Sequence, residues 1–102
     1  MEIKILTSPK DTLHILIFGD IDHHSSSTLR NEIDSSIQNK NPKKVILDFS
    51  EVNFMDTSGI GLILGRFKLT NKLNIKMEVI NTNSRIKRII EFSGIKSLGI
   101  LR

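Results

Sequence analysis

The strongest constraint on the fold is residues 44–72, where an apolar run is followed by a helical pattern. Residues 44–49, Lys-Val-Ile-Leu-Asp-Phe, form an apolar run flanked by charge. Such a run is typical of a central strand buried on both faces. Residues 58–72 then place Ile60, Ile63, Leu64 and Phe67 on one helix face. A buried strand followed by an amphipathic helix predicts an α/β domain with a mainly parallel sheet.

Two strands at the start of the chain are predicted to form a hairpin. Ile3 and Ile5 alternate with polar residues, as in a half-buried strand, and residues 13–18 form a second, more apolar run. The segment Pro9-Lys10-Asp11 between them has the composition of a turn. Because this connection is so short, we expect the two strands to pair with each other.

The remaining chain continues to alternate between helix and strand patterns. The further predicted elements are a helix over residues 25–39, a strand over 75–79, a helix capped by Asn83 or Ser84 and ending before Gly94, and a short strand over 98–101. The order is then β-β-α-β-α-β-α-β. We expect one α/β domain over residues 1–102, with a mostly parallel sheet of four to five strands that begins with a hairpin, and about three helices.

Composition and charge exclude several classes of site. The chain has no cysteine, which rules out disulfides, thiol nucleophiles and thiolate zinc sites. The net charge of +4 is spread along the chain without stacking aromatics, so we expect no direct nucleic-acid binding. A basic nucleic-acid-binding domain stays open as a remote alternative. No apolar run is long enough for a membrane span, and residues 1–4 lack a signal-peptide pattern, so we expect a cytoplasmic protein.

The segment Asp56-Thr57-Ser58-Gly59 is the best candidate for chemistry, because it joins the apolar strand to the helix that follows. Asp56 is well placed as the N-cap, with Thr57 and Ser58 in the first helical turn. A phosphoryl group attached there would meet unpaired N–H groups and the positive end of the helix dipole. Ordinary helix capping is the alternative interpretation of the same residues.

The glycines of this helix do not form a nucleotide-binding motif. Gly59, Gly61 and Gly65 have the wrong spacing for a dinucleotide fingerprint, and the Gly-Lys-Ser/Thr of a Walker loop is missing. Each glycine costs about 1 kcal/mol in a helix relative to alanine, so a compensating reason is expected. A close approach of the helix to the sheet or to a partner chain would supply one.

No catalytic or metal site is predicted. Asp22-His23-His24 lacks any known metal-ligand spacing, and these residues fit a surface loop or helix cap better. A hydrolase could be assembled on paper from Ser58, His24 and Asp56, but no Gly-x-Ser-x-Gly elbow is present. We therefore expect no enzyme activity, no cofactor and no metal.

Four stretches taken together resemble the STAS family, the domain of anti-sigma factor antagonists and sulfate-transporter tails. They are Gly19-Asp20-Ile21-Asp22-His23-His24, Val45-Ile46-Leu47-Asp48-Phe49, residues 54–68 around Asp56-Thr57-Ser58-Gly59, and Phe92-Ser93-Gly94-Ile95. They cover nearly the whole chain in the family's order. The combination is most similar to the sporulation branch, the anti-sigma-F factor antagonists.

The resemblance implies a switch controlled by phosphorylation. In this family the unphosphorylated antagonist binds an anti-sigma factor that is also a serine/threonine kinase, which frees the sigma factor. Phosphorylation ends that binding, and a separate protein phosphatase reverses it. Other anti-sigma kinases or signalling complexes stay open as partners. The protein is expected to be a monomer or weak dimer.

The resemblance also assigns roles to residues. The hydroxyl residue directly after the Asp is the phosphoacceptor, which is Thr57 here with Ser58 adjacent. The family usually has Ser at this position, so Thr57 is a departure. A second departure is that the family's usual C-terminal helix is missing after residue 101, which would leave part of the sheet or a helix uncovered. The expected partner-binding residues are Asp20, Asp22, His23, His24, Met55, Asp56, Gly59, Ile60 and Gly61.

Overall fold

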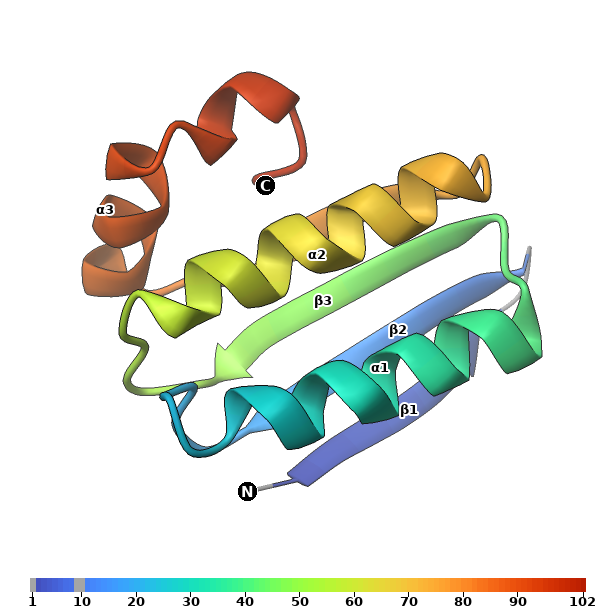
Figure 1. Cartoon of the computed structure of the whole chain (residues 1–102), viewed down its shortest axis with the longest axis horizontal. Coiled ribbons are helices and arrows are strands. Elements are labelled where there is room, and N and C mark those ends of the chain that lie inside the picture. The colour runs from blue at the N-terminus through green and yellow to red at the C-terminus, as the bar shows by residue number, and fades with distance from the viewer. Residues whose placement is uncertain (1, 9–10) are drawn as a thin grey trace.

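A four-stranded sheet with the order β1-β2-β3-β4 organises the chain (Figure 1). The structure, a computed structural model, describes residues 2–8 and 11–102. The strands are β1 (Glu2–Ser8), β2 (Thr12–Phe18), β3 (Lys44–Glu51) and β4 (Lys76–Ile80). β1 pairs antiparallel with β2, while β2–β3 and β3–β4 are parallel, so the predicted hairpin and mostly parallel sheet are confirmed. Pro9 and Lys10 of the predicted turn lie outside the described residues.

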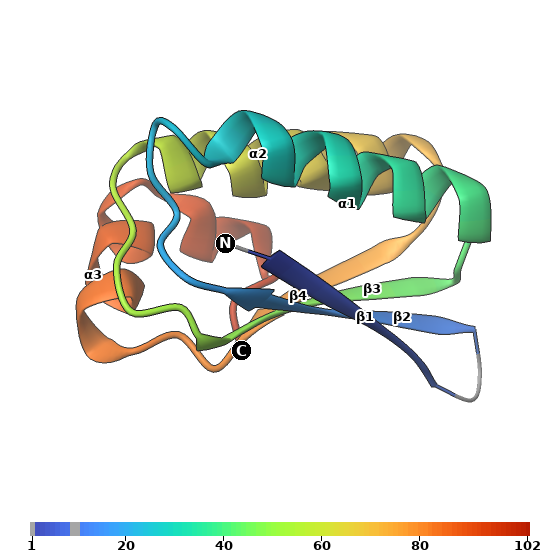
Figure 2. The ribbon, with the colours of Figure 1, turned by 90° about the horizontal axis from the view of Figure 1, so that it is seen from below.

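The helices are α1 (Ser26–Lys40), α2 (Ser58–Lys72) and α3 (Ser84–Phe92). α1 and α2 run side by side over one face of the sheet, and α3 lies beside the start of α2 (Figures 1 and 2). Asn83 is the cap of α3, because its side-chain oxygen accepts a hydrogen bond from the N–H of Ile86. Within residues 2–8 and 11–102, no helix has the length and apolar character needed to cross a membrane.

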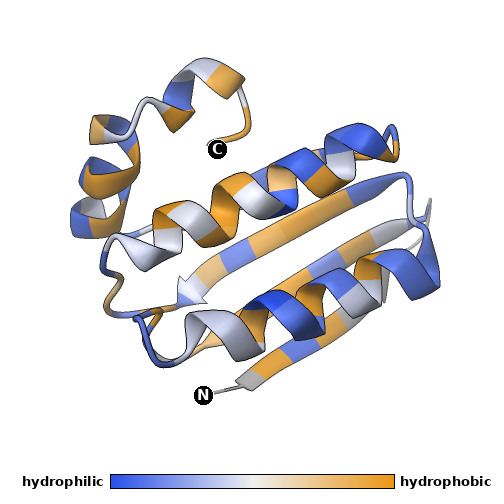
Figure 3. Ribbon diagram, viewed as in Figure 1, coloured by the Kyte–Doolittle hydropathy of each residue, from blue (hydrophilic) through white to orange (hydrophobic). Residues whose placement is uncertain are grey.

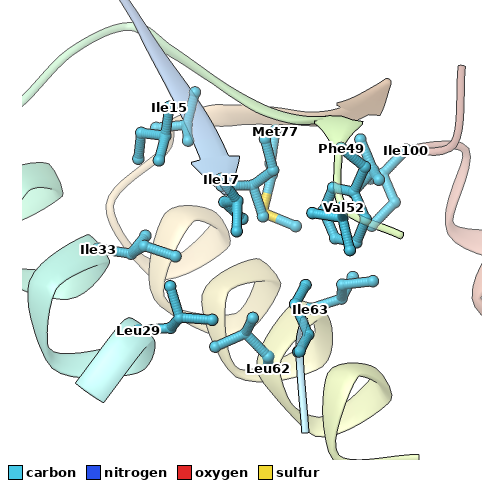
Figure 4. Close-up of a cluster of buried hydrophobic side chains, with 14 of the residues drawn as sticks. Ile15, Ile17, Leu29, Ile33, Phe49, Val52, Leu62, Ile63, Met77 and Ile100 are labelled. Atoms are coloured by element: carbon cyan, nitrogen blue, oxygen red, sulfur yellow. The ribbon is translucent and has the colours of Figure 1, made fainter. Parts of the chain in front are cut away.

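The core fills the space between the sheet and the two covering helices. Ile15 and Ile17 of β2 face Ile33 of α1 and Ile63 of α2, and all four side chains are fully buried (Figure 4). Buried and partly exposed residues alternate along β2, because successive side chains point to opposite faces, although β2 and β3 carry long hydrophobic stretches (Figure 3). The predicted helix faces are therefore the faces that pack on the sheet.

The apolar run of β3 predicts a strand buried on both faces, but the structure covers only one of its faces with helices. Val45, Leu47 and Phe49 are fully buried under the helices, whereas Ile46 on the opposite face is half-buried. The reason is that α1 and α2 both lie on the same side of the sheet (Figure 2). The sheet therefore keeps one face without a helical layer.

Asp48 is a buried carboxylate on that second face. Its Oδ2 lies 2.8 Å from Nε2 of His14, and its Oδ1 accepts from Nδ2 of Asn81 at 3.1 Å and from the N–H of Ser50 at 2.9 Å. Burial acts to raise the pKa of Asp48, but the hydrogen bonds from Ser50, His14 and Asn81 outweigh it and hold that pKa below its ordinary value. The ionised form is thus favoured in the folded chain.

The predicted last strand over residues 98–101 is wrong for most of its length. A short 3-10 helix covers Ile95–Leu98, and Gly99 turns the chain with a φ of 72°. Only Leu101 forms a bridge to Val79, at the outer edge of β4. A groove of about 450 Å³ lies between α2 and this segment, lined in part by Phe67.

Candidate functional site

The loops that follow β2 and β3 are joined by backbone hydrogen bonds. The N–H of Ile21 donates to the carbonyl of Phe54 at 2.9 Å, and the N–H of Asp56 donates to the carbonyl of Ile21 at 3.0 Å. Ile21 and Met55 thereby form a parallel bridge beyond the ends of the two strands. The expectation that residues 20–24 and the loop before α2 lie at the same sheet edge is confirmed.

Thr57, and not Asp56 as predicted, occupies the N-cap position of α2, and Asp56 is the residue before it. Oδ1 of Asp56 accepts hydrogen bonds from the backbone N–H of Ser58 at 2.8 Å and from the Ser58 hydroxyl at 2.5 Å. The two hydrogen bonds from Ser58 lower the pKa of Asp56, and the nearby His23 adds to this. The helix begins at Ser58, so Thr57 stands just before its first turn, and the Thr57 side chain makes no capping bond.

The two hydroxyl residues at this position differ in environment. The Thr57 side chain is exposed, and no hydrogen bond to it occurs in the described part of the chain. Ser58 is half-buried, and its hydroxyl is engaged with Asp56. Thr57 therefore presents the more accessible hydroxyl to a protein that approaches the start of α2.

Asp22 organises the neighbouring loop and the entry into α1. Its Oδ1 accepts from the N–H of His24 at 3.0 Å and of Ser25 at 2.9 Å, while the Ser25 hydroxyl oxygen accepts from the N–H of Asp22 at 2.9 Å. The hydrogen bond from the backbone of Ser25 is the largest influence that lowers the pKa of Asp22. Its Oδ2 has no hydrogen-bond partner among the described residues and stays available to an outside cation.

The predicted partner-binding residues divide into exposed and buried groups. Asp22, Asp56 and Ile60 are half-buried, and the exposed members are Asp20, His23, His24 and Gly61. Met55 is only 2% exposed, and Gly59 is buried against it. Direct partner contact by Met55 and Gly59 does not fit this structure, since both support the loop from within.

The glycines differ in what their backbone positions require. A Cβ at Gly59 would overlap Cγ and Sδ of Met55, whereas a Cβ at Gly61 or Gly65 would meet open space. A close approach therefore exists at Gly59, but to Met55 of the preceding loop and not to the sheet or a partner chain as predicted. A close contact does not explain the glycine at position 65. It does not explain Gly61 either, because Gly61 is exposed.

The site shows no arrangement for hydrolysis or metal binding. The His23 and His24 rings stand edge to face with centroids 6.0 Å apart. In the described ranges, no three His, Asp or Glu side chains are grouped to hold a metal ion. The Ser58 hydroxyl donates to Asp56, and no hydrogen bond joins it to His24 in that part of the chain. The arrangement therefore differs from the Ser-His-Asp order of a hydrolase.

Comparison with known proteins identifies the family. The sequence matches the STAS domain over residues 4–100. The chain belongs to the STAS domain family. Relatives of this STAS domain include proteins named as anti-sigma factor antagonists. The anti-sigma F factor antagonist of Paenibacillus polymyxa is 35% identical over 86 residues, which are 84% of this chain and 74% of that protein.

Further relatives and solved structures agree with this assignment. The anti-sigma-B factor antagonist of Listeria monocytogenes is 28% identical over 96% of this chain and 87% of its own. The anti-sigma factor antagonist SpoIIAA in its unphosphorylated form superposes with a TM-score of 0.84 at 26% identity, covering 99% of this chain and 86% of that one. The phosphorylated form of the Bacillus protein SpoIIAA gives a TM-score of 0.76 at 26% identity, covering 99% of this chain and 89% of that one.

Two features of this STAS domain escaped the sequence analysis. Phe54 is 44% exposed beside Thr57, and an apolar residue within a polar loop could have indicated it. Arg66 is a buried cation of α2, with its Nε 2.6 Å from Oδ1 of Asp34 on α1. No sequence pattern distinguishes Arg66 from a surface cation, since Lys68 and Lys72 of the same helix are exposed.

Proposed function

We propose that this chain is an anti-sigma factor antagonist that works by binding and not by catalysis. Its unphosphorylated form binds an anti-sigma factor that is also a serine/threonine kinase, and the sigma factor is released. The kinase uses ATP to phosphorylate the start of α2, the antagonist dissociates, and a protein phosphatase restores it. Support comes from relatives named anti-sigma F and anti-sigma-B factor antagonists, and from the similarity to SpoIIAA in both of its forms.

Thr57 accepts the phosphate in this proposal, and its exposed, unengaged hydroxyl is the observation that carries the proposal. A kinase must bring the γ-phosphate of ATP into line with a hydroxyl that it can approach. Thr57 offers such a hydroxyl, while that of Ser58 is held by Asp56. The family resemblance also places the acceptor directly after the Asp.

Phosphorylation would end binding through charge, with little change of fold. The phosphate adds about −1.5 to −2 charge beside Asp56, on a surface that the partner must desolvate. The positive end of the α2 dipole tolerates this charge, so the helix should persist. A change of a few kcal/mol in binding free energy is enough to move Kd by orders of magnitude.

The partner surface is formed by the exposed parts of both loops and the first turn of α2. Asp22 is suited to meet an arginine or lysine of the kinase through its free Oδ2. Phe54 adds an apolar contact beside Thr57. The other contributors are Asp20, His23, His24, Asp56, Ile60 and Gly61. We place the protein in the cytoplasm, in the sporulation branch of the family, as a monomer or weak dimer.

The decisive experiment mixes the protein with a purified anti-sigma kinase and ATP, then reads the intact mass and maps the modified residue. One phosphoryl group at Thr57 is expected, with none in Thr57→Ala, which should still bind the kinase. Thr57→Glu should bind at least about tenfold more weakly. Ser58→Ala should still be phosphorylated, and Thr28→Ala on α1 is the matched control. Phosphate found at Ser58 would show that Ser58, and not Thr57, is the acceptor. Equal binding of the kinase by all variants would contradict control of binding by phosphorylation.

A second candidate is a STAS module for a different anti-sigma kinase or a larger signalling complex. Relatives named anti-sigma-B factor antagonists, similar over 96% of this chain, favour keeping it. Competition between two purified anti-sigma factors for this protein distinguishes the two. Preference for the sporulation-type partner supports the first proposal, and preference for the other supports the second.

A further inference from the structure

A pocket lies between α1 and α2, next to the proposed partner surface, with which it shares Gly61. Its volume is about 200 Å³. Two residues come from α1 and four from the first turns of α2, which runs alongside it (Figure 1). The lining residues are Ser26, Arg30, Ser58, Gly61, Leu62 and Arg66. Its polar side chains are two guanidiniums and two hydroxyls, and no carboxylate lines it.

One of the two arginines of this pocket, Arg66, pairs with a carboxylate of α1. Arg66 is 5% exposed, its Nε lies 2.6 Å from Oδ1 of Asp34, and its Nη1 donates to the carbonyl of Leu62 at 3.2 Å. No acceptor for Nη2 of Arg66 is found in residues 2–8 and 11–102. Arg30 stands one turn before Asp34 on α1. Two guanidiniums and one carboxylate leave an excess of positive charge.

The contact between Arg66 and Asp34 does not satisfy the arginine completely. Neither Nε of Arg66 nor Oδ1 of Asp34 has a well-directed hydrogen bond, although the two atoms are close. Burial lowers the pKa of Arg66, Asp34 raises it, and the charge of Arg30 lowers it again. Arg30 and Arg66 line the same pocket, so two positive charges are placed around one space. An anion between them would relieve their repulsion.

Backbone dipoles add to the positive potential of the pocket. Ser26 and Ser58 are the first residues of α1 and α2, so the N-terminal ends of two helices meet at one pocket. Helix N-termini carry a partial positive charge and unpaired N–H groups. Arginine guanidiniums match the geometry of phosphate oxygens with two parallel hydrogen bonds.

We propose that this pocket binds a single phosphate group between the guanidiniums of Arg30 and Arg66. The ligand is inorganic phosphate or the phosphate group of a small monoester, since both present the same oxygens. Pockets for whole drug-sized ligands occupy roughly 300–1,000 Å³, so a volume of about 200 Å³ suits one phosphate group and excludes an enclosed nucleoside. Binding of phosphate there requires no kinase, so it can be tested separately from the function proposed above.

The test follows backbone amide and arginine Nε resonances by NMR during titration with sodium phosphate at constant ionic strength. Saturable shifts are expected at Ser26, Ser58, Gly61 and Leu62. Arg30→Gln should weaken the binding at least about tenfold, because it removes the exposed guanidinium without disturbing the buried Arg66 pair. Arg88→Gln on α3 removes the same charge from an exposed helix and is the matched control. Circular dichroism verifies that both variants remain folded.

The outcomes separate a site from general attraction. Non-saturable shifts, or equal weakening by Arg30→Gln and Arg88→Gln, would overturn the proposal. A second titration uses methyl phosphate. Similar binding of the two probes supports a site that accepts monoesters, and binding of inorganic phosphate alone supports a site for the free ion. Absence of saturable binding by both probes refutes the site.

Discussion

Replacing Gly59 with alanine tests how tightly the start of α2 is packed. Gly59 is buried in the first turn, and an added Cβ would lie closer than 3.0 Å to Cγ and Sδ of Met55. Met55 is itself only 2% exposed, so its side chain must change conformation in a full interior. Because Met55 bridges to Ile21, the displacement would reach the loop that carries Asp56 and Thr57.

The expected change is the net of two opposing effects. Overpacking a well-filled interior costs about 1–3 kcal/mol. Alanine is favoured over glycine by about 1 kcal/mol within a helix, and by less in the first turn. Gly59→Ala should therefore lower the free energy of unfolding by about 1–2 kcal/mol. Gly61→Ala and Gly65→Ala, whose new methyl groups enter open space, should instead raise it by about 0.4–1 kcal/mol.

Urea unfolding followed by far-ultraviolet circular dichroism measures these differences, since the chain has neither Trp nor Tyr for fluorescence. The dependence on urea should keep its slope while the midpoints move in opposite directions. Combining Gly59→Ala with Met55→Ala should cost less than the sum of the single changes, because the shorter side chain leaves room. If Gly59→Ala is as stable as Gly61→Ala, the close contact does not constrain the helix and the reasoning is refuted.

Three further predictions concern the rest of the fold. The pKa of Asp48 is lowered in the folded chain, so its contribution to stability is complete above its ordinary pKa and is lost as pH falls through the folded value. Asp48→Asn should therefore flatten the decline of the free energy of unfolding below about pH 4, measured by urea unfolding. An unchanged dependence of that free energy on pH would contradict this. Ile33→Ala should lower the free energy of unfolding by about 2–5 kcal/mol, seen as a lower Tm, with an effect under 1 kcal/mol counting against complete burial. Asp34→Asn should cost about 1–3 kcal/mol by leaving Arg66 without a counter-charge, and Asp34→Leu combined with Arg66→Met should recover most of that loss in the same assay.

The order of elements was predictable because the spacing of apolar residues changes between strand and helix. Ile33 and Ile37 repeat every four residues, whereas Ile15 and Ile17 repeat every two, and the structure buries all four. The number of sheet faces covered by helices was less predictable. The side chain of Ile46 is apolar, yet no helix covers it, because an apolar run does not tell a strand with two helical layers from a strand with one.

The position of the site was predictable, but the direction of its side chains was not. Parallel neighbouring strands end at the same edge, so the meeting of their loops followed from the predicted topology. Phe54 and Met55 are adjacent apolar residues of one loop, yet the first is 44% exposed and the second is 2% exposed. Loops have no periodicity, so only the bridge between Ile21 and Met55 decides which side chain turns inward.

The hydrogen bonds between Ile21, Phe54 and Asp56 that join the two loops are made by main-chain atoms. The donors and acceptors at Ile21, Phe54 and Asp56 persist whatever side chains these residues carry, with proline at Ile21 or Asp56 as the exception that removes a donor. The exposed residues 20, 23, 24 and 61 can therefore be substituted without breaking the main-chain hydrogen bonds that position the hydroxyl at residue 57. A duplicated gene could thus acquire a new partner through these surface positions alone, while the geometry around that hydroxyl stays as it was.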